Sequence, residues 1–402
     1  MSGGRRRGLR PTHRCRITPP QSSCLMSRVV EILQALVKIP SVNPDGAPGS
    51  PFAGEHRVAA WTGNFLRGLG AEVILEEVLP DRPNVFGHFA GTAGRPRILL
   101  APHTDTVDVE GMRIDPFGGT VIGDRLYGRG ASDTKGTMAA MLAALEEIGA
   151  ERLGQLGNAV TFVGLIGEET GQHGSRHLAR HHGGKYSFAL VGEPTECGVV
   201  HTHKGCSWIT LETQGVACHG STPELGRSAI FEMVAALVAL IRTLPGRLQE
   251  APWIHPVLGH PTVNVGTIRG GTRPNIVPSH CAIEIDIRET PALHRYGVVR
   301  FLEEWRHEMG LDDKLSIRGA SSCAPLDTPP DNPYVQKLAA LGAPLIGAPW
   351  FCDAAWLFNE GAIPSVAAGP GSIAQAHTAD EFIEVAALEE GVRFYRRFLE
   401  SL

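Results

Sequence analysis

Residues 98–136 read ILLAPHTDTVDVEGMRIDPFGGTVIGDRLYGRGASDTKG. The apolar run that opens this stretch is too short for a helix and ends at a proline, which predicts a buried strand. His103 and Asp105 follow at once. Because residues two apart in an extended chain point to the same side, their side chains should leave the strand together, at the end where open α/β sheets bind ligands. About thirty residues on, a glycine turn delivers a second acid, Asp133, before a helix-like run.

The same pattern returns three times along the chain. Short apolar runs at 159–166, 188–191 and 365–368 each stop near a glycine, and they are followed by Glu168 and Glu169, by Glu193 and by His377, respectively. Strands of this kind alternate with amphipathic helical runs, which predicts an α/β domain with a mostly parallel sheet and helices on both faces. Because parallel strands end at one edge, these side chains should lie near one another.

The collected side chains have the composition of a metal site. Two histidines and several carboxylates are enough for two zinc ions with a shared carboxylate ligand. Glu168 and Glu169 are adjacent and cannot easily bind the same ion, so one of them is left to act as a general base. Any one of these residues alone is more often an ordinary polar group, but seven at successive strand ends favour a site. Carboxylate-rich sites of this kind also accept cobalt or manganese.

The pattern changes near residue 202. Alternating strands and two amphipathic helices follow in the order β-α-β-β-α-β, which is typical of a half-exposed sheet with helices on one face. We therefore expect an inserted α+β domain over residues 202–315. The catalytic domain would comprise residues 26–201 and 316–402.

Composition limits the partners that we expect. The chain of 402 residues is 43% hydrophobic and 20% charged, which is ordinary for a soluble globular protein. Its net charge of -5 gives no reason to expect binding to nucleic acid. We find no apolar stretch near the ~18 residues that cross a bilayer, and so expect no membrane partner. The eight cysteines form no C-x-x-C pair, which indicates reduced thiols and a cytoplasmic protein.

Residues 1–25 differ from the rest of the chain. They contain six arginines and no acid, which leaves a charge of -11 on the remainder. The segment lacks the apolar region of a secretory signal. We expect a disordered basic extension, or a start site assigned too far upstream, because Met26 opens a clean amphipathic helix.

Seven segments together carry a family resemblance: APHTDTV (101–107), LYGRGASDTKG (126–136), GEETGQHG (167–174), GEPT (192–195), GSTPELGRSAI (220–230), RGGTRPNIVP (269–278) and GPGSIAQAHTADEF (369–382). In order and spacing they resemble the di-zinc amidohydrolases, the family of aminoacylase, acetylornithine deacetylase, succinyl-diaminopimelate desuccinylase and glutamate carboxypeptidase. The likeness runs from about residue 27 to the C-terminus. It is strongest to acetylornithine deacetylase-like members.

The resemblance implies how the metal ligands are shared. One zinc ion would be held by His103, Asp133 and Glu193, and the other by Asp133, Glu169 and His377. Asp133 would then bridge the two ions. The family also places a cis peptide bond directly after the bridging acid, here between Asp133 and Thr134.

The resemblance further implies roles for two other carboxylates. Asp105 would orient the histidine ligand. Glu168 would be the general base for a zinc-bridged hydroxide that attacks an amide carbonyl. It would then pass its proton to the leaving amine.

Substrate-binding residues also follow from the family motifs. The inserted domain would be a lid and a dimerisation domain, and its His219 would reach the active site of the partner in a homodimer. Asn275 and Arg288 would recognise the substrate, with the arginine binding a carboxylate. Lys204 is a weaker candidate, and Gly369 would shape the pocket wall.

The expected reaction is hydrolysis of an N-acyl-L-amino acid, of the N-acetylornithine type. A dipeptidase or carboxypeptidase on the same site is the main alternative. A succinyl-diaminopimelate desuccinylase is disfavoured, because bulky residues at 350–353 (WFCD) replace the small ones that those enzymes carry. A non-catalytic metal-binding scaffold is a remote alternative, against which the presence of Glu168 argues.

Overall fold

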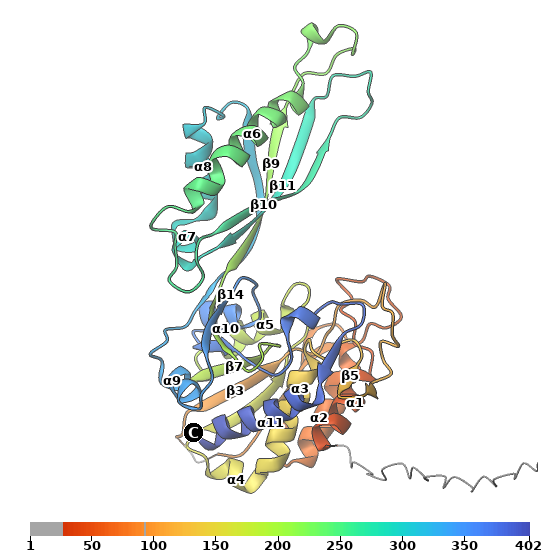
Figure 1. Ribbon diagram of the computed structural model, residues 1–402, viewed down its shortest axis with the longest axis vertical. Coiled ribbons are helices and arrows are strands. Elements are labelled where there is room, and N and C mark those ends of the chain that lie inside the picture. Colours follow the sequence, from red (N-terminus) through yellow and green to blue (C-terminus); the bar gives the residue numbers. More distant parts are fainter. Residues whose placement is uncertain (1–26, 92–93) are drawn as a thin grey trace, which may run out of the picture.

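The computed structural model describes residues 27–91 and 94–402, which form two units (Figure 1). The chain passes between them twice, from strand β8 to β9 and from β12 to β13. The basic segment expected to be disordered, residues 1–25, lies outside the described residues. Figure 1 shows the first unit with the C-terminus at the bottom and the second unit extending above it.

The first unit is built on a sheet with a parallel centre and antiparallel edges. Its strand order is β1-β2-β6-β3-β7-β15-β8-β13, with β14 paired to β8, and β6, β3, β7 and β15 run parallel to one another. The prediction of a mostly parallel sheet in an α/β unit is confirmed. The strands are β1 (Glu72–Leu79), β2 (Arg82–His88), β3 (Arg97–Pro102), β6 (Ala159–Gly164), β7 (Phe188–Gly192), β8 (Val199–His203), β13 (Leu326–Asp327), β14 (Leu345–Ala348) and β15 (Ser365–Ala367).

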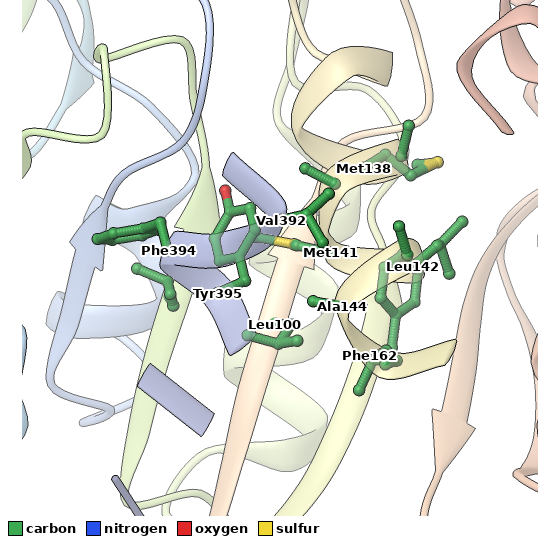
Figure 2. Packing of buried hydrophobic residues seen from close by; sticks show 14 of the residues in the cluster. Leu100, Met138, Met141, Leu142, Ala144, Phe162, Val392, Phe394 and Tyr395 are labelled. Carbon is green, nitrogen blue, oxygen red and sulfur yellow. The ribbon is translucent and has the colours of Figure 1, made fainter. Parts of the chain in front are cut away.

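Strand β3 is apolar throughout because helices cover both faces of the sheet. Ile98 and Leu100 pack in the cluster that contains helices α1, α3 and α11, whereas Leu99 and Ala101 pack on the opposite face with α5 and α10. Figure 2 shows side chains of α3 and α11 meeting above Leu100. Strands buried on both faces lose the alternation of half-exposed strands. The helices of this unit are α1 (Arg28–Val37), α2 (Glu55–Gly68), α3 (Lys135–Ile148), α4 (Ala150–Gln155), α5 (His173–His182), α9 (Pro333–Ala340), α10 (Ala354–Asn359) and α11 (Val385–Glu400).

The second unit is an antiparallel sheet of order β10-β11-β9-β12 with helices on one face (Figure 1). Its elements follow the predicted β-α-β-β-α-β order: β9 (Gly205–Gln214), α6 (Ala229–Leu248), β10 (Thr262–Gly270), β11 (His280–Glu289), α7 (Pro291–Tyr296), α8 (Val298–Glu308) and β12 (Leu315–Cys323). Strand β12 pairs with β9 as far as Cys323. We therefore propose that the inserted unit ends there, eight residues beyond the boundary predicted at 315.

Helix α6 is long and apolar enough to cross a membrane, judged by length and composition alone. The expectation that no apolar stretch has that length was therefore wrong. One side of the helix, including Met233, Leu240 and Leu244, packs on the sheet of the second unit. Only 28% of its most apolar window is buried, however, so much apolar surface remains on its other side.

A small third sheet ties together two segments of the first unit. It contains β4 (Thr120–Ile122), β5 (Arg125–Tyr127) and β16 (Phe382–Glu384), in the order β16-β5-β4. The pairing joins the chain just before Asp133 to the chain just after His377, although about 250 residues separate the two.

Candidate metal centre and active site

The site is assembled where the parallel strands end. His103 follows β3 and forms a bridge with Leu165, which follows β6. Glu193 follows β7, and the loop that carries His377 follows β15. This arrangement places at one sheet edge the side chains that the sequence pattern had assigned to strand ends.

Asp133 lies between the two histidines. Its Oδ1 is 3.1 Å from Nε2 of His103, and its Oδ2 is 3.5 Å from Nε2 of His377. Nε2 of His377 is also 2.9 Å from Oε2 of Glu169. Ligand atoms of His103, Asp133 and Glu169 lie within 4.8 Å of one another, which is compact enough to hold a metal ion. Asp133 thus offers one oxygen to each histidine, the arrangement that a bridging ligand requires.

Glu193 provides the test of whether metal ions fit here. It is buried, and its Oε1 has no hydrogen-bond partner within the described ranges 27–91 and 94–402. Burial and the negative charge of Asp133 raise the pKa of Glu193 well above its usual range. Burial followed by the charge of Asp133 also raises the pKa of Glu169, to about 7. Divalent cations would neutralise this buried cluster of carboxylates and bind its unpaired oxygen. The residues therefore fit the metal ions that the sequence predicts.

The pKa values of the two histidines are raised as well, in their case by neighbouring carboxylates. Hydrogen bonding to Asp133 and Glu169 raises the pKa of the half-exposed His377 to about 10. Burial would lower the pKa of His103, but its contacts with Asp105 and Asp133 outweigh burial and raise it. Protons on these imidazoles occupy the places where cations bind, so metal binding should release them.

Asp105 contacts both the imidazole of His103 and the loop that follows β6. Nδ1 of His103 lies 3.0 Å from the backbone oxygen of Asp105 and 3.4 Å from its Oδ1, so the backbone oxygen is the nearer partner. The carboxylate accepts hydrogen bonds from the backbone amides of Glu168 and Glu169, each at 3.1 Å, and from Nδ2 of Asn43 at 2.7 Å. Asp105 therefore fixes the loop that carries the expected base and one expected ligand.

Glu168 stands beside the cluster without joining it. It is half-buried, and its Oε1 accepts a hydrogen bond from Nε2 of Gln172 at 3.3 Å. Burial raises the pKa of Glu168 well above its usual range, and the charge of Glu193 adds to the rise. A carboxylate with raised proton affinity at the edge of a candidate metal site is suited to accept a proton from water.

Sequence reasoning missed the residue that holds the Asp133 turn. The fully buried Glu381 accepts hydrogen bonds from the backbone amides of Gly130, Ser132 and Asp133, and from Nη1 of Arg129 at 2.7 Å. The peptide bond after Asp133 is cis, as the family resemblance implied. Glu381 lies four residues after His377 within one quoted motif, and that proximity was the available signal.

Three predicted substrate residues lie near the junction of the two units or behind the cluster. Arg288 donates from Nε and Nη2 to Oδ2 of Asp286, and its guanidinium lies 5.6 Å from the ring centre of Phe351. Nζ of the buried Lys204 donates to the backbone oxygen of His260, at 2.6 Å. Gly369 is buried against the backbone of Glu193, where an added Cβ would come within 2.9 Å of the backbone oxygen.

His219 and Asn275 are not brought to the histidine and carboxylate cluster of their own chain. Both are exposed, and they lie on adjoining loops, since the backbone amide of Gly220 donates to the oxygen of Asn275. Figure 1 shows these loops at the far end of the second unit, in green and teal at the top. In this arrangement neither residue acts at the cluster of its own chain.

Known proteins resemble this chain in sequence and in fold. The model of Peptidase family M20/M25/M40 matches residues 99–401. An acetylornithine deacetylase of Proteus mirabilis is 31% identical over 92% of this chain and 96% of its own length, and one of Vibrio cholerae is 27% identical over 92% and 98%. In fold, an M20 metallo-carboxypeptidase of Sulfolobus solfataricus matches with a TM-score of 0.72 at 19% identity, covering 93% of this chain and 99% of that one. The aminopeptidase PepT of Bacillus cereus matches with a TM-score of 0.71 at 21% identity, covering 93% and 98%. The chain belongs to Peptidase family M20/M25/M40.

Proposed function

We propose that this protein is a metal-dependent hydrolase that cleaves the amide bond of an N-acyl-L-amino acid, with N-acetylornithine-type compounds as its substrates. The observation that carries the proposal is the position of Glu168, a half-buried carboxylate held next to the His103–Asp133–Glu169 cluster without being part of it. The relatives named acetylornithine deacetylase support the choice of substrate.

Two divalent cations, zinc in our proposal, would occupy the cluster. His103, Asp133 and Glu193 would hold one, and Asp133, Glu169 and His377 the other. When bound, such ions polarise an amide carbonyl and lower the pKa of water. Cobalt and manganese are compatible with the same nitrogen and oxygen ligands.

The side chains of the protein carry the remaining work. Glu168 removes a proton from the attacking water and returns it to the nitrogen of the leaving amine. Asp105 keeps the backbone of Glu168 in place through the amide at 3.1 Å. Arg288 offers a guanidinium to the substrate carboxylate, in exchange for its present partner Asp286.

We also propose that the second unit forms a homodimer. On the outer side of helix α6, Phe231, Val234, Val238 and Ile241 follow one another at helical spacing and are 78%, 50%, 45% and 66% exposed. This apolar stripe lies on the side of the helix away from the sheet, where a second copy would bury it. In such a dimer, the partner's His219 would reach the metal site of this chain. Within a single chain, His219 does not reach that site.

Substrate choice is tested with the zinc-loaded enzyme. We expect release of free amine from N-acetylornithine and other N-acetyl amino acids to exceed release from a panel of dipeptides. Glu168→Gln should abolish turnover, whereas Glu147→Gln, at an exposed surface ion pair with Arg396, should not. Faster cleavage of the dipeptides would refute the deacylase proposal, and full activity of Glu168→Gln would refute the mechanism.

The dimer is tested by mixing two inactive variants. His219→Asn keeps its own Glu168, and Glu168→Gln keeps its own His219, so a mixed dimer has one complete site only if His219 acts on the partner. We expect activity to appear when the two variants are unfolded, mixed and refolded together. Ile241→Asp should give a 43 kDa monomer by sedimentation. A monomeric wild-type protein, or no activity in the mixture, would contradict this arrangement.

A further inference from the structure

The side chain of Gln172 is buried beside the expected base. It is 3% exposed, and its Nε2 donates to Oε1 of Glu168 at 3.3 Å. Within residues 27–91 and 94–402, this is the only hydrogen bond that the protein makes to the Glu168 carboxylate. One oxygen of the carboxylate is thereby restrained, and the other stays available.

The orientation of this amide is fixed from behind. Oε1 of Gln172 accepts a hydrogen bond from Nε1 of Trp356 at 2.6 Å, and a second, from Sγ of Cys323, at 3.6 Å. An indole N–H can only donate, so the amide oxygen must face Trp356 and the NH2 group must face Glu168. The reversed amide would place two donors together at Trp356 and two acceptors together at Glu168.

The backbone at Gln172 indicates that the side chain is needed there. Its φ of 49° and ψ of 41° lie in the left-handed region, which disfavours residues with a Cβ and is usually occupied by glycine, asparagine or aspartate. Gln172 stands at the N-cap of helix α5, yet its side chain does not cap the helix. The amide is directed instead to Glu168 and Trp356.

Trp356 is itself held in place. It lies on helix α10, 184 residues along the chain from Gln172, and the guanidinium of Arg176 lies 4.6 Å from the centre of its ring. A row of contacts therefore runs from Arg176 through Trp356 and Gln172 to Glu168.

We infer that Gln172 is a positioning residue for Glu168, and that Trp356 acts through it by setting which end of the amide faces the base. The inference rests on the proposed function, in which Glu168 is the general base. Without the hydrogen bond, the Glu168 side chain would populate several rotamers. A smaller fraction of bound substrate molecules would then meet a carboxylate oxygen within reach of the proton on the attacking water. In the proposed function, neither substrate binding nor metal binding uses this bond.

Three variants test the kinetic consequence. Gln172→Met keeps the length of the side chain but removes the donor, and we expect kcat to fall about tenfold to a hundredfold, with KM nearly unchanged and two metal ions still bound. Trp356→Phe keeps an aromatic ring under Arg176 and should cause a smaller fall. The double variant should be no slower than Gln172→Met, because Trp356 acts through Gln172.

Matched controls remove the same groups elsewhere. Gln34→Met deletes an amide that donates to the Gly119 oxygen, and Trp305→Phe deletes an indole bond to Thr243 in the second unit. Both should leave kcat unchanged. An unchanged kcat in Gln172→Met, a loss of bound metal in it, or a double variant that multiplies the two defects would overturn the inference.

A measurement independent of turnover separates this inference from the proposed function. The side-chain amide signals of Gln172, assigned by their loss in Gln172→Met, should shift in nitrogen-15 NMR spectra of both Glu168→Gln and Trp356→Phe, while those of Gln34 stay in place. Signals of Gln172 that do not move overturn the inference, whatever the enzyme hydrolyses. A wild-type enzyme that cleaves only dipeptides overturns the proposed substrate and leaves this test standing.

Discussion

Replacing Glu381 should loosen the turn that presents Asp133. The carboxylate of Glu381 is fully buried and accepts three backbone hydrogen bonds, at 3.1 Å from Gly130, 2.9 Å from Ser132 and 3.0 Å from Asp133, together with one from Arg129. The side chain of Arg129 is 4% exposed, so the ion pair is buried as well. Within the described residues, every group that hydrogen-bonds to the Glu381 carboxylate is thus a donor.

The size of the effect follows from these contacts. Glu381→Ala leaves a buried guanidinium without its partner, which destabilises by about 3–5 kcal/mol. Each unpaired backbone amide adds about 1–3 kcal/mol. The sum approaches the whole stability of a typical domain, so we expect this variant to unfold. Glu381→Gln keeps the shape but turns one acceptor into a donor among donors, and we expect it to lose about 2–3 kcal/mol.

The assay is urea unfolding of the metal-free protein, followed by competition for zinc with a coloured chelator. Glu381→Gln should shift the unfolding midpoint downward and weaken zinc binding about tenfold to a hundredfold, as variants behind metal ligands commonly do. Glu384→Gln, at an exposed position three residues on, is the control and should change neither quantity. A Glu381→Gln protein with unchanged midpoint and unchanged zinc affinity would show that the turn keeps its shape without the carboxylate.

Three further predictions concern stability and metal binding. Burial lowers the pKa of His203 to about 4, so on acidification the unfolded chain takes up the proton before the folded chain does. The free energy of unfolding should therefore fall by about 3 kcal/mol as the pH drops from 6.5 to 4. A His203→Asn variant with the same acid dependence in urea titrations would exclude this cause. Gly369→Ala would put a Cβ 2.5 Å from Cγ2 of Thr137 and 2.9 Å from the backbone oxygen of Glu193, and should lower the free energy of unfolding by about 1–3 kcal/mol. Gly246→Ala, with open space around it, should not lower it. Equal melting temperatures of the two variants would refute the packing argument. Removing metal with a chelator should lower the melting temperature, because ions present at a hundred times their Kd add about 2.7 kcal/mol, and a melting temperature indifferent to chelation and to added zinc would contradict the site.

The edge of the sheet could be predicted from local patterns. An apolar run of strand length that stops at a proline or glycine indicates where a buried strand ends, and His103 and Asp105 follow β3 as that pattern requires. The same reasoning placed Glu193 after β7. Alternation of period two likewise predicted the half-exposed sheet of the second unit. The apolar length of helix α6 was underestimated, because a helix that packs on the sheet with one side can also be apolar on its other side.

Contacts that depend on the packing of distant elements left no such pattern. The carboxylate of Asp105 was expected to orient His103, yet it bonds the backbone of Glu168 and Glu169 more closely than it approaches the imidazole. Backbone amides look alike in every sequence, so a side chain that binds them cannot be matched to its partner beforehand.

The sequence alone therefore predicted which residue types gather at the carboxyl ends of the strands. It could do so because the signal, an apolar run of strand length followed by a histidine or an acid, lies in one short stretch and recurs along the chain. Only the tertiary structure decided which side chains contact one another, and which other residues hold them in place. Glu381 reaches the turn of Asp133 across 248 residues, and Trp356 reaches Gln172 across 184. Hydrogen bonds act over about 3 Å, so such pairs are selected by the final packing of helices and loops rather than by any spacing along the chain.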